Sequence, residues 1–516
     1  MKQVLQNFRS GELRVEDVPA PFLKPKHVLV QNLFSVVSAG TEKHAVDFAN
    51  KSLLDKARAR PDLVKKVMQV AQTDGIATAY QLAMSRLDDW RPLGYSSVGR
   101  VLEIGEGITH IAKDDIVACA GAQYANHAEI ICVPLNLVAR VPEIVNPRHA
   151  AFATLGAIAL QGIHRANLSP GERVGVIGLG LIGQLTALIL KQYNFDVMGA
   201  DVNSAQVERA RALGISATTN DAALALAQTL SHGAGLDAVV VTAATASSEP
   251  IQLAGELCRL RGRVSAVGLV GMDVPRQLYY DKELDFLVSR SYGPGRYDPQ
   301  YEEHGDDYPL AYVRWTENRN LQEFLRLLEN GLNVEPLITH TLPLERAQDV
   351  YDMLLKNPRK EYVLGVLFEY PAQPSHATRV ELPQILAASR ATRAVVQLGI
   401  IGVGQYARGT LLPALKKNPH AQIRAMCSAS GRSARSEAET SGAQYATSDY
   451  LEILRDDSID AVIVATRHNL HAQIAVEAIA RGKHVFVEKP PALNRAELQM
   501  LVDALRENPR AQFMVG

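Results

Sequence analysis

A glycine-rich stretch in the middle of the chain has the spacing of a loop that holds the pyrophosphate of a dinucleotide. In VGVIGLGLIGQL, Gly178, Gly180 and Gly183 follow a predicted strand and open a predicted helix. The first glycine permits a tight turn, the second lets the backbone approach the pyrophosphate, and the third lets helix and strand pack closely. Free N–H groups at the helix start complete the anion site. The expected contacts are Gly178, Gly180, Leu181, Ile182 and Gly183; the alternative is a glycine turn that binds nothing.

An acidic residue indicates which dinucleotide this first site takes. Asp201 ends the next predicted strand, 23 residues after Gly178. A carboxylate at this place accepts hydrogen bonds from the ribose hydroxyls and repels a 2′-phosphate. The first site is therefore predicted to bind NAD in preference to NADP.

A second loop of the same kind occurs in LGIIGVGQYARG, where Gly402 and Gly404 again follow a predicted strand. Ser428 stands where an acid would select NAD, and Ser428 and Arg432 suit a 2′-phosphate. We therefore expect NAD or NADP at this second site. A solvated surface turn explains Arg432 equally well.

The order of predicted elements places both loops in parallel sheets. From about residue 173, and again after 394, apolar runs alternate with helical patterns. Residues 1–150 carry short strands broken by Gly and Pro, and strand-like sequence returns near 361, so a split β-rich domain should enclose the first parallel sheet. The expected segments are a β-rich catalytic domain (1–150 and 285–370), a nucleotide-binding domain (151–284), a linker (371–393) and a second nucleotide-binding domain (394–516).

A helical insertion is expected within residues 45–91. Pro61 suits the first position of a helix, and Val64, Val67, Met68 and Ala71 fall on one face at helical spacing. Two interpretations stay open. The helices either form a lid over a site or pack on the β-rich domain with their Lys and Arg side chains solvated.

Composition narrows the classes of function. The 516 residues are 47% hydrophobic and 21% charged, with a net charge of -1. Such a balance does not attract nucleic acid or a membrane surface, so a small-molecule ligand is expected. The four cysteines form no CxxC pair, and the polar N-terminus and lack of a long apolar run predict a cytoplasmic, non-membrane protein.

Residues 1–370 resemble the medium-chain alcohol dehydrogenase superfamily. SAGTEKH at 38–44 is similar to that family's Cys-Gly-Thr-Asp-x-His, and LGYSSVGRV at 93–101 to its Gly-His-Glu-x-x-Gly. The metal-binding positions differ, because Ala39, Tyr95, Ser96 and Thr154 stand where the family's zinc ligands and neighbouring Glu would be. We therefore expect no zinc.

Without a metal, hydrogen-bond donors must polarise a carbonyl, as in the family's zinc-free reductases. Tyr95 and Thr41 are the expected donors, with His44 as a proton relay and Glu42 as its partner. A structural role for Tyr95 and a surface position for His44 are the alternatives.

A Gly/Pro-rich loop after the first parallel sheet supplies candidate substrate contacts. The segment 289–320 gathers Tyr292, Arg296, Tyr297 and Arg314. These side chains suit an anionic or polyhydroxylated ligand such as a sugar nucleotide. An ordered surface or homo-oligomer contact is the alternative. With the helical insertion, SAGTEKH and SYGPGRYDP, the segment resembles a group of bacterial proteins that fuse a zinc-free dehydrogenase to a second oxidoreductase module.

Residues 394–516 resemble the glucose-fructose oxidoreductase and inositol dehydrogenase family, chiefly through ATRHNLHAQIAVEAIARGKHVFVEKP. The resemblance implies that Lys489 touches nicotinamide and substrate. In that family a separate α/β substrate domain follows the nucleotide sheet, whereas this sequence stops at Gly516. The second module is thus expected to hold a dinucleotide without completing the family's catalysis. Its expected cofactor contacts are Gly402, Gly404, Gln405, Tyr406, Ser428, Arg432, Thr466, His471 and Glu488.

Together these features predict an α/β chain in which a β-rich GroES-like domain encloses a Rossmann domain and a second Rossmann domain follows. The expected function is a zinc-independent NAD(H)-linked oxidoreductase acting on a hydroxyl or carbonyl of a sugar-like or nucleotide-sugar substrate. The alternative is a non-catalytic dinucleotide-binding sensor or scaffold.

Overall fold

The computed structural model describes residues 1–38, 40, 42, 46, 55, 58, 61–75, 90–357, 361–383 and 395–516. The chain divides into two compact units. Unit 1 comprises residues 1–22, 47–92 and 373–516, and unit 2 comprises 23–46 and 93–372. The division thus groups the first 22 residues with the C-terminal sheet, whereas the sequence interpretation grouped them with the β-rich domain.

Unit 2 contains a six-stranded parallel sheet in the order β11-β10-β9-β12-β13-β14. Buried apolar side chains of β9 and β12, such as Ile177 and Val239, pack with Ile251 and Leu257 of α10. The strand order reverses beside β9, and ligands bind at such a reversal. The strands are β9 (Arg173–Ile177), β10 (Asp196–Asp201), β11 (Ser216–Thr219), β12 (Leu236–Val241), β13 (Cys258–Ala266) and β14 (Asp285–Val288). The helices are α7 (Leu181–Gln192), α8 (Ser204–Ala212), α9 (Ala223–Leu230), α10 (Glu249–Leu257) and α11 (Arg276–Asp281).

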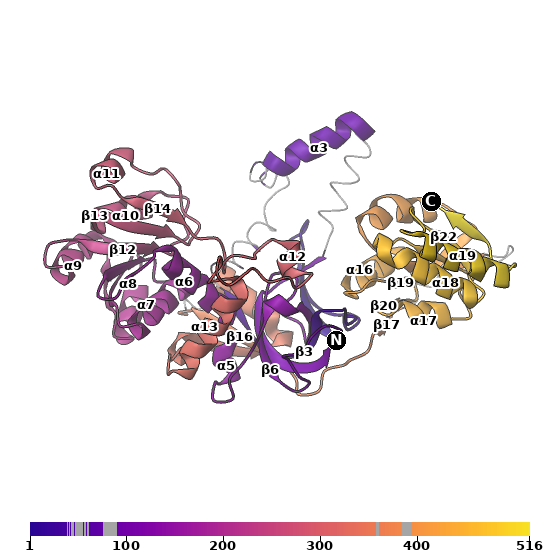
Figure 1. The fold of residues 1–516 in the computed structure, drawn as a ribbon, viewed down its shortest axis with the longest axis horizontal. Helices are drawn as coiled ribbons and strands as arrows, with labels where there is room; N and C mark the ends of the chain where they lie inside the picture. Colours follow the sequence, from indigo (N-terminus) through magenta and orange to yellow (C-terminus); the bar gives the residue numbers. More distant parts are fainter. Residues whose placement is uncertain are drawn as a thin grey trace. The chain divides into compact units, whose positions relative to one another are not determined.

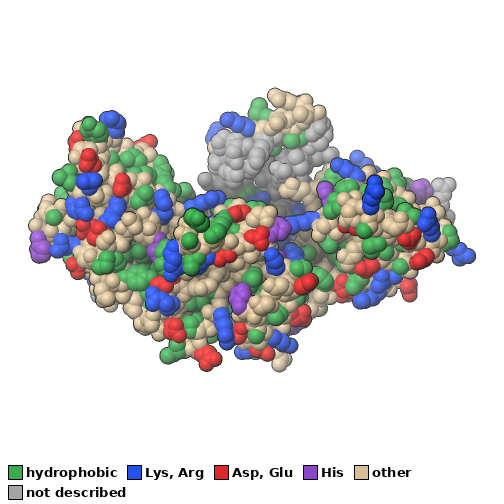
Figure 2. All heavy atoms as spheres, in the orientation of Figure 1, with side chains coloured by type: hydrophobic (Ala, Val, Ile, Leu, Met, Phe, Trp, Pro, Cys, Tyr) green, Lys and Arg blue, Asp and Glu red, His purple; other side chains and the backbone are tan. Residues whose placement is uncertain are grey.

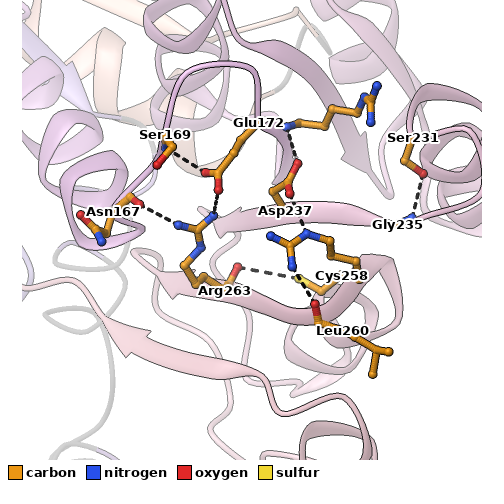
Figure 3. A network of polar contacts seen from close by, with 11 residues as sticks. Asn167, Ser169, Glu172, Ser231, Gly235, Asp237, Cys258, Leu260 and Arg263 are labelled. Carbon is orange, nitrogen blue, oxygen red and sulfur yellow. Dashed lines mark hydrogen bonds and ion pairs between the residues drawn. The ribbon is translucent and has the colours of Figure 1, made fainter.

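A network of polar contacts fixes the opposite, amino-terminal edge of this sheet (Figure 3). The Asp237 carboxylate on β12 accepts hydrogen bonds from the Arg173 backbone N–H on β9 and the Arg259 guanidinium on β13. Arg263 on β13 forms an ion pair with Glu172 at 2.5 Å. The edge away from the glycine loop is therefore held by side chains of β12 and β13, which contact the start of β9 and the residue before it.

A second sheet of seven strands completes unit 2, and its β16 pairs antiparallel with β3. Chain segments on either side of the parallel sheet thus form one β-rich domain, which confirms the expected fold class. The strands are β3 (His27–Ser38), β5 (Ser96–Ile104), β6 (Ile116–Ala120), β7 (Ile130–Pro134), β8 (Val138–Arg140), β15 (Ile338–Pro343) and β16 (Gly365–Glu369). The helices are α5 (Pro147–Ala150), α6 (Ala153–Arg165), α12 (Pro299–Glu302), α13 (Glu317–Glu329) and α14 (Ala347–Leu355).

Unit 1 contains another seven-stranded sheet, part of the orange and yellow ribbon in Figure 1. Its strand order is β17-β20-β19-β18-β21-β22-β23. Six strands are parallel and repeat the order of the first sheet, while β17 (Arg379–Glu381), within the expected linker, pairs antiparallel at the edge. The parallel strands are β18 (Val396–Ile401), β19 (Ala421–Cys427), β20 (Tyr445–Thr447), β21 (Ala461–Val464), β22 (His484–Val487) and β23 (Phe513–Val515). The helices are α15 (Leu412–Leu415), α16 (Arg432–Ser441), α17 (Tyr450–Arg455), α18 (His471–Ala480) and α19 (Arg495–Glu507).

Unit 1 also contains a three-stranded antiparallel sheet in the order β2-β1-β4, which we call the N-terminal sheet. Its strands are β1 (Lys2–Asn7), β2 (Leu13–Asp17) and β4 (Trp90–Pro92). Helix α3 (Pro61–Asp74) begins at the expected proline. Val64 and Met68 are exposed, so the predicted apolar face is only partly covered within the described structure.

The surface shows no block of one charge on the face drawn in Figure 2, where acidic and basic side chains are interspersed. Among the described helices, none combines the length and apolar character needed to cross a bilayer.

Candidate nucleotide-binding and active sites

A cavity of about 800 Å³ in unit 2 brings together most of the residues expected at the first site. It opens at the carboxyl edge of the parallel sheet, beside β9, where strand order reverses. The glycine loop and the end of β10 line one part, and the β-rich domain and the loop after β14 line another. The predicted residues on its wall are Gly178, Gly180, Leu181, Ile182, Asp201, Tyr95, Tyr292, Arg296 and Tyr297.

The three glycines of the first loop have different surroundings. Gly178 has φ +92°, and a Cβ there would lie 2.6 Å from the Ala243 nitrogen. A Cβ on Gly183 would lie 1.7 Å from the Gly178 carbonyl oxygen, which explains why helix α7 can pack so close to the strand. Gly180 has no atom within 4 Å of an added Cβ. The open side of Gly180 therefore faces the space that a pyrophosphate would need.

The Asp201 carboxylate is oriented by the glycine loop. Its Oδ2 accepts the Leu179 N–H at 2.6 Å, and its Oδ1 accepts the Asn203 N–H at 2.8 Å. Asp201 is only partly buried and lines the cavity. A carboxylate with remaining acceptor capacity at the end of β10 fits a ribose that carries two free hydroxyls.

Tyr95 reaches the cavity because the preceding turn packs tightly. Gly94 has φ +91°, and a Cβ there would lie 2.7 Å from the His127 nitrogen. The Tyr95 carbonyl accepts hydrogen bonds from the Gly121 N–H and the Thr154 hydroxyl. The backbone is therefore held from two sides, and the side chain lines the cavity.

A buried polar network lies under the same wall. The Glu42 carboxylate accepts the Ser38 N–H at 3.1 Å, contacts His127 Nε2 at 3.1 Å and accepts the Tyr351 hydroxyl. Ser38 itself lines the cavity. The expected partner of Glu42, His44, lies outside the described residues, as does Thr41. Sequence reasoning missed His127, because no local pattern signals a contact across 85 positions.

The described residues do not fit a catalytic zinc ion. The Ser96 hydroxyl donates to the Ala151 carbonyl at 2.6 Å, and the Thr154 hydroxyl donates to the Tyr95 carbonyl at 3.2 Å. Zinc in proteins requires Cys, His or carboxylate ligands in a near-tetrahedral group. Within the described ranges, no group of three such side chains is placed to hold a metal.

The loop after β14 supplies donors to the cavity wall. The Arg296 guanidinium stacks over the rings of Tyr292 and Tyr297, at 5.3 and 4.0 Å from their centroids. Arg296 also forms an ion pair with Glu302, yet its Nε has no hydrogen-bond partner among the described residues. The buried Tyr292 hydroxyl likewise lacks one. Because burial raises the pKa of Tyr292 well above its ordinary value, that hydroxyl stays protonated and can donate.

A second carboxyl group lies behind this wall without a partner. Glu317, at the first position of α13, is fully buried, and neither of its oxygens has a hydrogen-bond partner among the described residues. Burial first, and the nearby Glu302 second, raise the pKa of Glu317 to about 9 against the opposing effect of Arg296. Glu317 is therefore a neutral carboxylic acid at pH 7. Sequence reasoning missed it because burial, the main cause of the raised pKa, has no signature in the local pattern of this segment.

Arg314 lies elsewhere. Its guanidinium stacks 3.9 Å from the Trp315 centroid, and the opposite partner of that indole is His164, stacked at 4.1 Å. Arg314 lines a separate cavity of about 590 Å³. The structure thus does not bring Arg314 to the wall that Tyr292 and Arg296 share.

The glycine loop of unit 1 repeats the geometry of the first. Gly402 has φ +99° and packs against Ala465, while Gly404 has open space around an added Cβ. The Gly402 N–H donates to the Cys427 carbonyl at 3.0 Å, as Gly178 does to the Ala200 carbonyl at 2.8 Å. Ser428 therefore occupies the place of Asp201.

The other residues expected at this second site lie along the carboxyl edge of the sheet. The buried His471 ring contacts the Pro490 carbonyl at 2.9 Å and the Thr466 carbonyl at 3.2 Å, which joins the ends of β21 and β22. A hydrogen bond to Glu488 is the main cause of the raised pKa of Tyr406. Gln405 and Lys489 are exposed.

Sequence comparison finds a family match within each unit. Residues 182–303 match the family described as zinc-binding dehydrogenase, and residues 396–516 match the oxidoreductase family with an NAD-binding Rossmann fold. An uncharacterised oxidoreductase from Streptococcus pneumoniae serotype 4 is 38% identical over 122 residues, which is 24% of this chain and 32% of that protein. The chain thus spans about a third of this curated relative.

Solved structures show the same fold for the first module. Galactitol-1-phosphate dehydrogenase from Escherichia coli has a TM-score of 0.55 and 20% identity, covering 72% of this chain and 100% of that one. An alcohol dehydrogenase from Escherichia coli CFT073 complexed with NADH has a TM-score of 0.53 and 18% identity, covering 72% and 99%. These findings confirm the expected combination of a dehydrogenase-like module with a second oxidoreductase-family module.

Proposed function

We propose that this chain is an NAD(H)-linked dehydrogenase or reductase that acts on a hydroxyl or carbonyl group in the cavity of unit 2. The proposal is carried by one observation: the open glycine Gly180, the carboxylate of Asp201 and the donors Tyr95, Tyr292 and Arg296 line the same cavity. When bound, the nicotinamide would accept or donate the hydride. The residues of the chain bind, orient and supply hydrogen bonds.

Each residue has a distinct role in this proposal. Gly180 and the first N–H groups of α7 would hold the pyrophosphate, and Asp201 would accept both ribose hydroxyls. The Tyr95 hydroxyl would donate to the oxygen of the reacting carbon, which stabilises the negative charge that grows there as a carbonyl is reduced. Thr41 and His44 remain candidates for the same oxygen and its proton. We propose zinc-independent chemistry, because the described residues at the metal-binding positions are not ligands.

The substrate would carry oxygen atoms remote from the reacting carbon. Tyr292 and Arg296 each present a donor atom that has no acceptor among the described residues, and a ligand in the cavity would supply one. Sugar-like and nucleotide-sugar molecules have hydroxyl, carboxylate or phosphate oxygens for this purpose. Tyr297, stacked on Arg296, would pack against the ligand.

A substrate panel tests the proposal. NADH oxidation and NAD⁺ reduction are followed with nucleotide sugars, sugar alcohols and sugar phosphates, before and after treatment with a zinc chelator. We expect turnover that survives chelation and falls by about a hundredfold or more in Tyr95→Phe, the scale for one lost oxyanion donor. Tight NADH binding with no turnover across the panel would instead support a sensor or scaffold.

A further inference from the structure

The loop between β19 and α16, residues 428–431, occupies the ribose position of the second nucleotide site. Ser428 stands at the place of Asp201, as the matched Gly402 and Gly178 hydrogen bonds show. Its hydroxyl accepts the Ala434 N–H at 3.1 Å. The position that carries the ribose-binding carboxylate in the first site therefore carries a hydroxyl here. Arg432, the first residue of α16, follows four positions later.

A part of unit 1 that is far away in the sequence contacts this loop. The Phe22 N–H donates to the Ala429 carbonyl at 2.9 Å, and the Ser448 hydroxyl donates to the Ala20 carbonyl at 2.5 Å. Gly431 has φ +69°, and a Cβ there would lie 2.5 Å from the Pro19 carbonyl oxygen. The chain at Pro19–Phe22 thus lies directly against the ribose loop.

The N-terminal sheet, β2-β1-β4, engages both arginines at the start of α16. The Arg432 guanidinium donates to the Trp90 carbonyl of β4. Arg435 forms an ion pair with Glu16 of β2 at 2.7 Å, and both side chains are largely buried. The positive charge that would suit a 2′-phosphate is therefore directed at the N-terminal sheet.

We propose that this N-terminal clamp, formed by Glu16, Pro19–Phe22 and Trp90, selects the cofactor of the second site by holding Arg432 at the Trp90 carbonyl, so that the site takes NAD(H) rather than NADP(H). A 2′-phosphate gains most from charge-assisted hydrogen bonds to a guanidinium. Here the Trp90 carbonyl already accepts a hydrogen bond from Nη1 of Arg432, which reduces the donors that a 2′-phosphate could engage. The inference concerns unit 1 and is independent of catalysis in unit 2.

Calorimetric titration with NADH and NADPH tests the clamp in the full chain. Gly180→Asp is used as the background so that nucleotide binding reports on the second site alone. The variant places a carboxylate at the first pyrophosphate site, where an added Cβ meets no atom within 4 Å. The double variant Gly180→Asp/Gly404→Asp is the blank. We expect Gly180→Asp to bind NADH about tenfold or more tightly than NADPH, and Arg432→Ala to change that ratio by less than about threefold.

A second experiment weakens the contact between the clamp and α16. Glu16→Gln removes the ion pair that ties β2 to Arg435, which lies in the same first turn of α16 as Arg432. Because β2 and β4 both pair with β1, loosening β2 from α16 should also loosen the contact between Trp90 and Arg432, and NADPH affinity should rise relative to NADH by about threefold or more. The rise should vanish in Glu16→Gln/Arg432→Ala. Thermal melting checks that each variant is folded, and Arg432→Lys replaces Arg432→Ala if that variant is not.

Four outcomes overturn the proposal. The first is binding of NADPH as tight as that of NADH in Gly180→Asp. The second is a selective loss of NADPH affinity in Arg432→Ala, which would make Arg432 the phosphate ligand. The third is an unchanged ratio of NADPH to NADH affinity in Glu16→Gln, and the fourth is no binding of either nucleotide to Gly180→Asp. None of these results bears on turnover in unit 2.

Discussion

Replacing the buried Glu317 by Gln should stabilise unit 2 at neutral pH. Glu317 is fully buried without a hydrogen-bond partner among the described residues, and Arg296 is already paired with Glu302. The Arg296 guanidinium thus pairs with only one of the two nearby carboxyl groups, that of Glu302, and the other, Glu317, keeps its proton. Glutamine has nearly the same shape and no charge, so it should replace the neutral acid at little structural cost.

The size of the effect follows from the raised pKa. The ordinary pKa of Glu is 4.5 and that of Glu317 is about 9, so between these values the folded state binds a proton that the unfolded state has lost. Stability therefore falls as pH rises through this window, by about 1.4 kcal/mol per pH unit from this group. The Glu317→Gln variant lacks this loss. The free energy of unfolding of Glu317→Gln should therefore exceed that of the unmodified protein by less than about 1 kcal/mol at pH 5 and by about 3 kcal/mol at pH 7.

Tryptophan fluorescence can follow unit 2 alone. The chain has two tryptophans, Trp90 in unit 1 and Trp315 in unit 2. In a Trp90→Phe background, denaturant unfolding at pH 5, 6, 7 and 8 therefore reports on the surroundings of Trp315. Glu329→Gln, an exposed change on the same helix, is the matched control and should stay within about 0.5 kcal/mol at every pH.

One result would refute this reasoning. If Glu317→Gln destabilises unit 2, or changes its stability equally at all four pH values, then Glu317 is ionised in the folded protein and has a partner that it needs.

Three further predictions concern the first parallel sheet. Gly183→Ala should unfold or strongly destabilise unit 2, while Gly180→Ala should leave its melting temperature nearly unchanged, because only the first Cβ meets backbone. Glu172→Gln should cost about 1–3 kcal/mol in Trp315-detected unfolding, since its largely buried arginine partner loses its counter-charge; an unaltered midpoint would contradict this. In a Gly404→Asp background, Asp201→Asn should weaken NADH binding by about tenfold and improve NADPH relative to NADH in fluorescence titrations; equal loss for both would argue against ribose contact.

The fold could be predicted where the signal is local. The glycine loops of both sheets, the strand ending at Asp201 and the helix starting at Pro61 all depend on spacings of a few residues, and the structure has them at those places. Equal strand order in the two sheets then makes Ser428 the counterpart of Asp201.

Contacts between distant segments could not be predicted in this way. Arg296 and Arg314 belong to one loop by sequence, yet a turn and helix α12 separate them, and they line different cavities. The Glu42 network joins residues up to 309 positions apart. Likewise, no periodicity indicates that β2 places Glu16 against Arg435.

The central claim, that chemistry takes place in the cavity of unit 2, is tested most directly by comparing turnover of two glycine variants. Gly180→Asp and Gly404→Asp each add a carboxylate at one pyrophosphate site, and in both places an added Cβ meets no atom within 4 Å. With a substrate identified in the panel, NADH-linked turnover should be lost in Gly180→Asp and retained in Gly404→Asp. Turnover that survives Gly180→Asp, or disappears only in Gly404→Asp, would contradict the account.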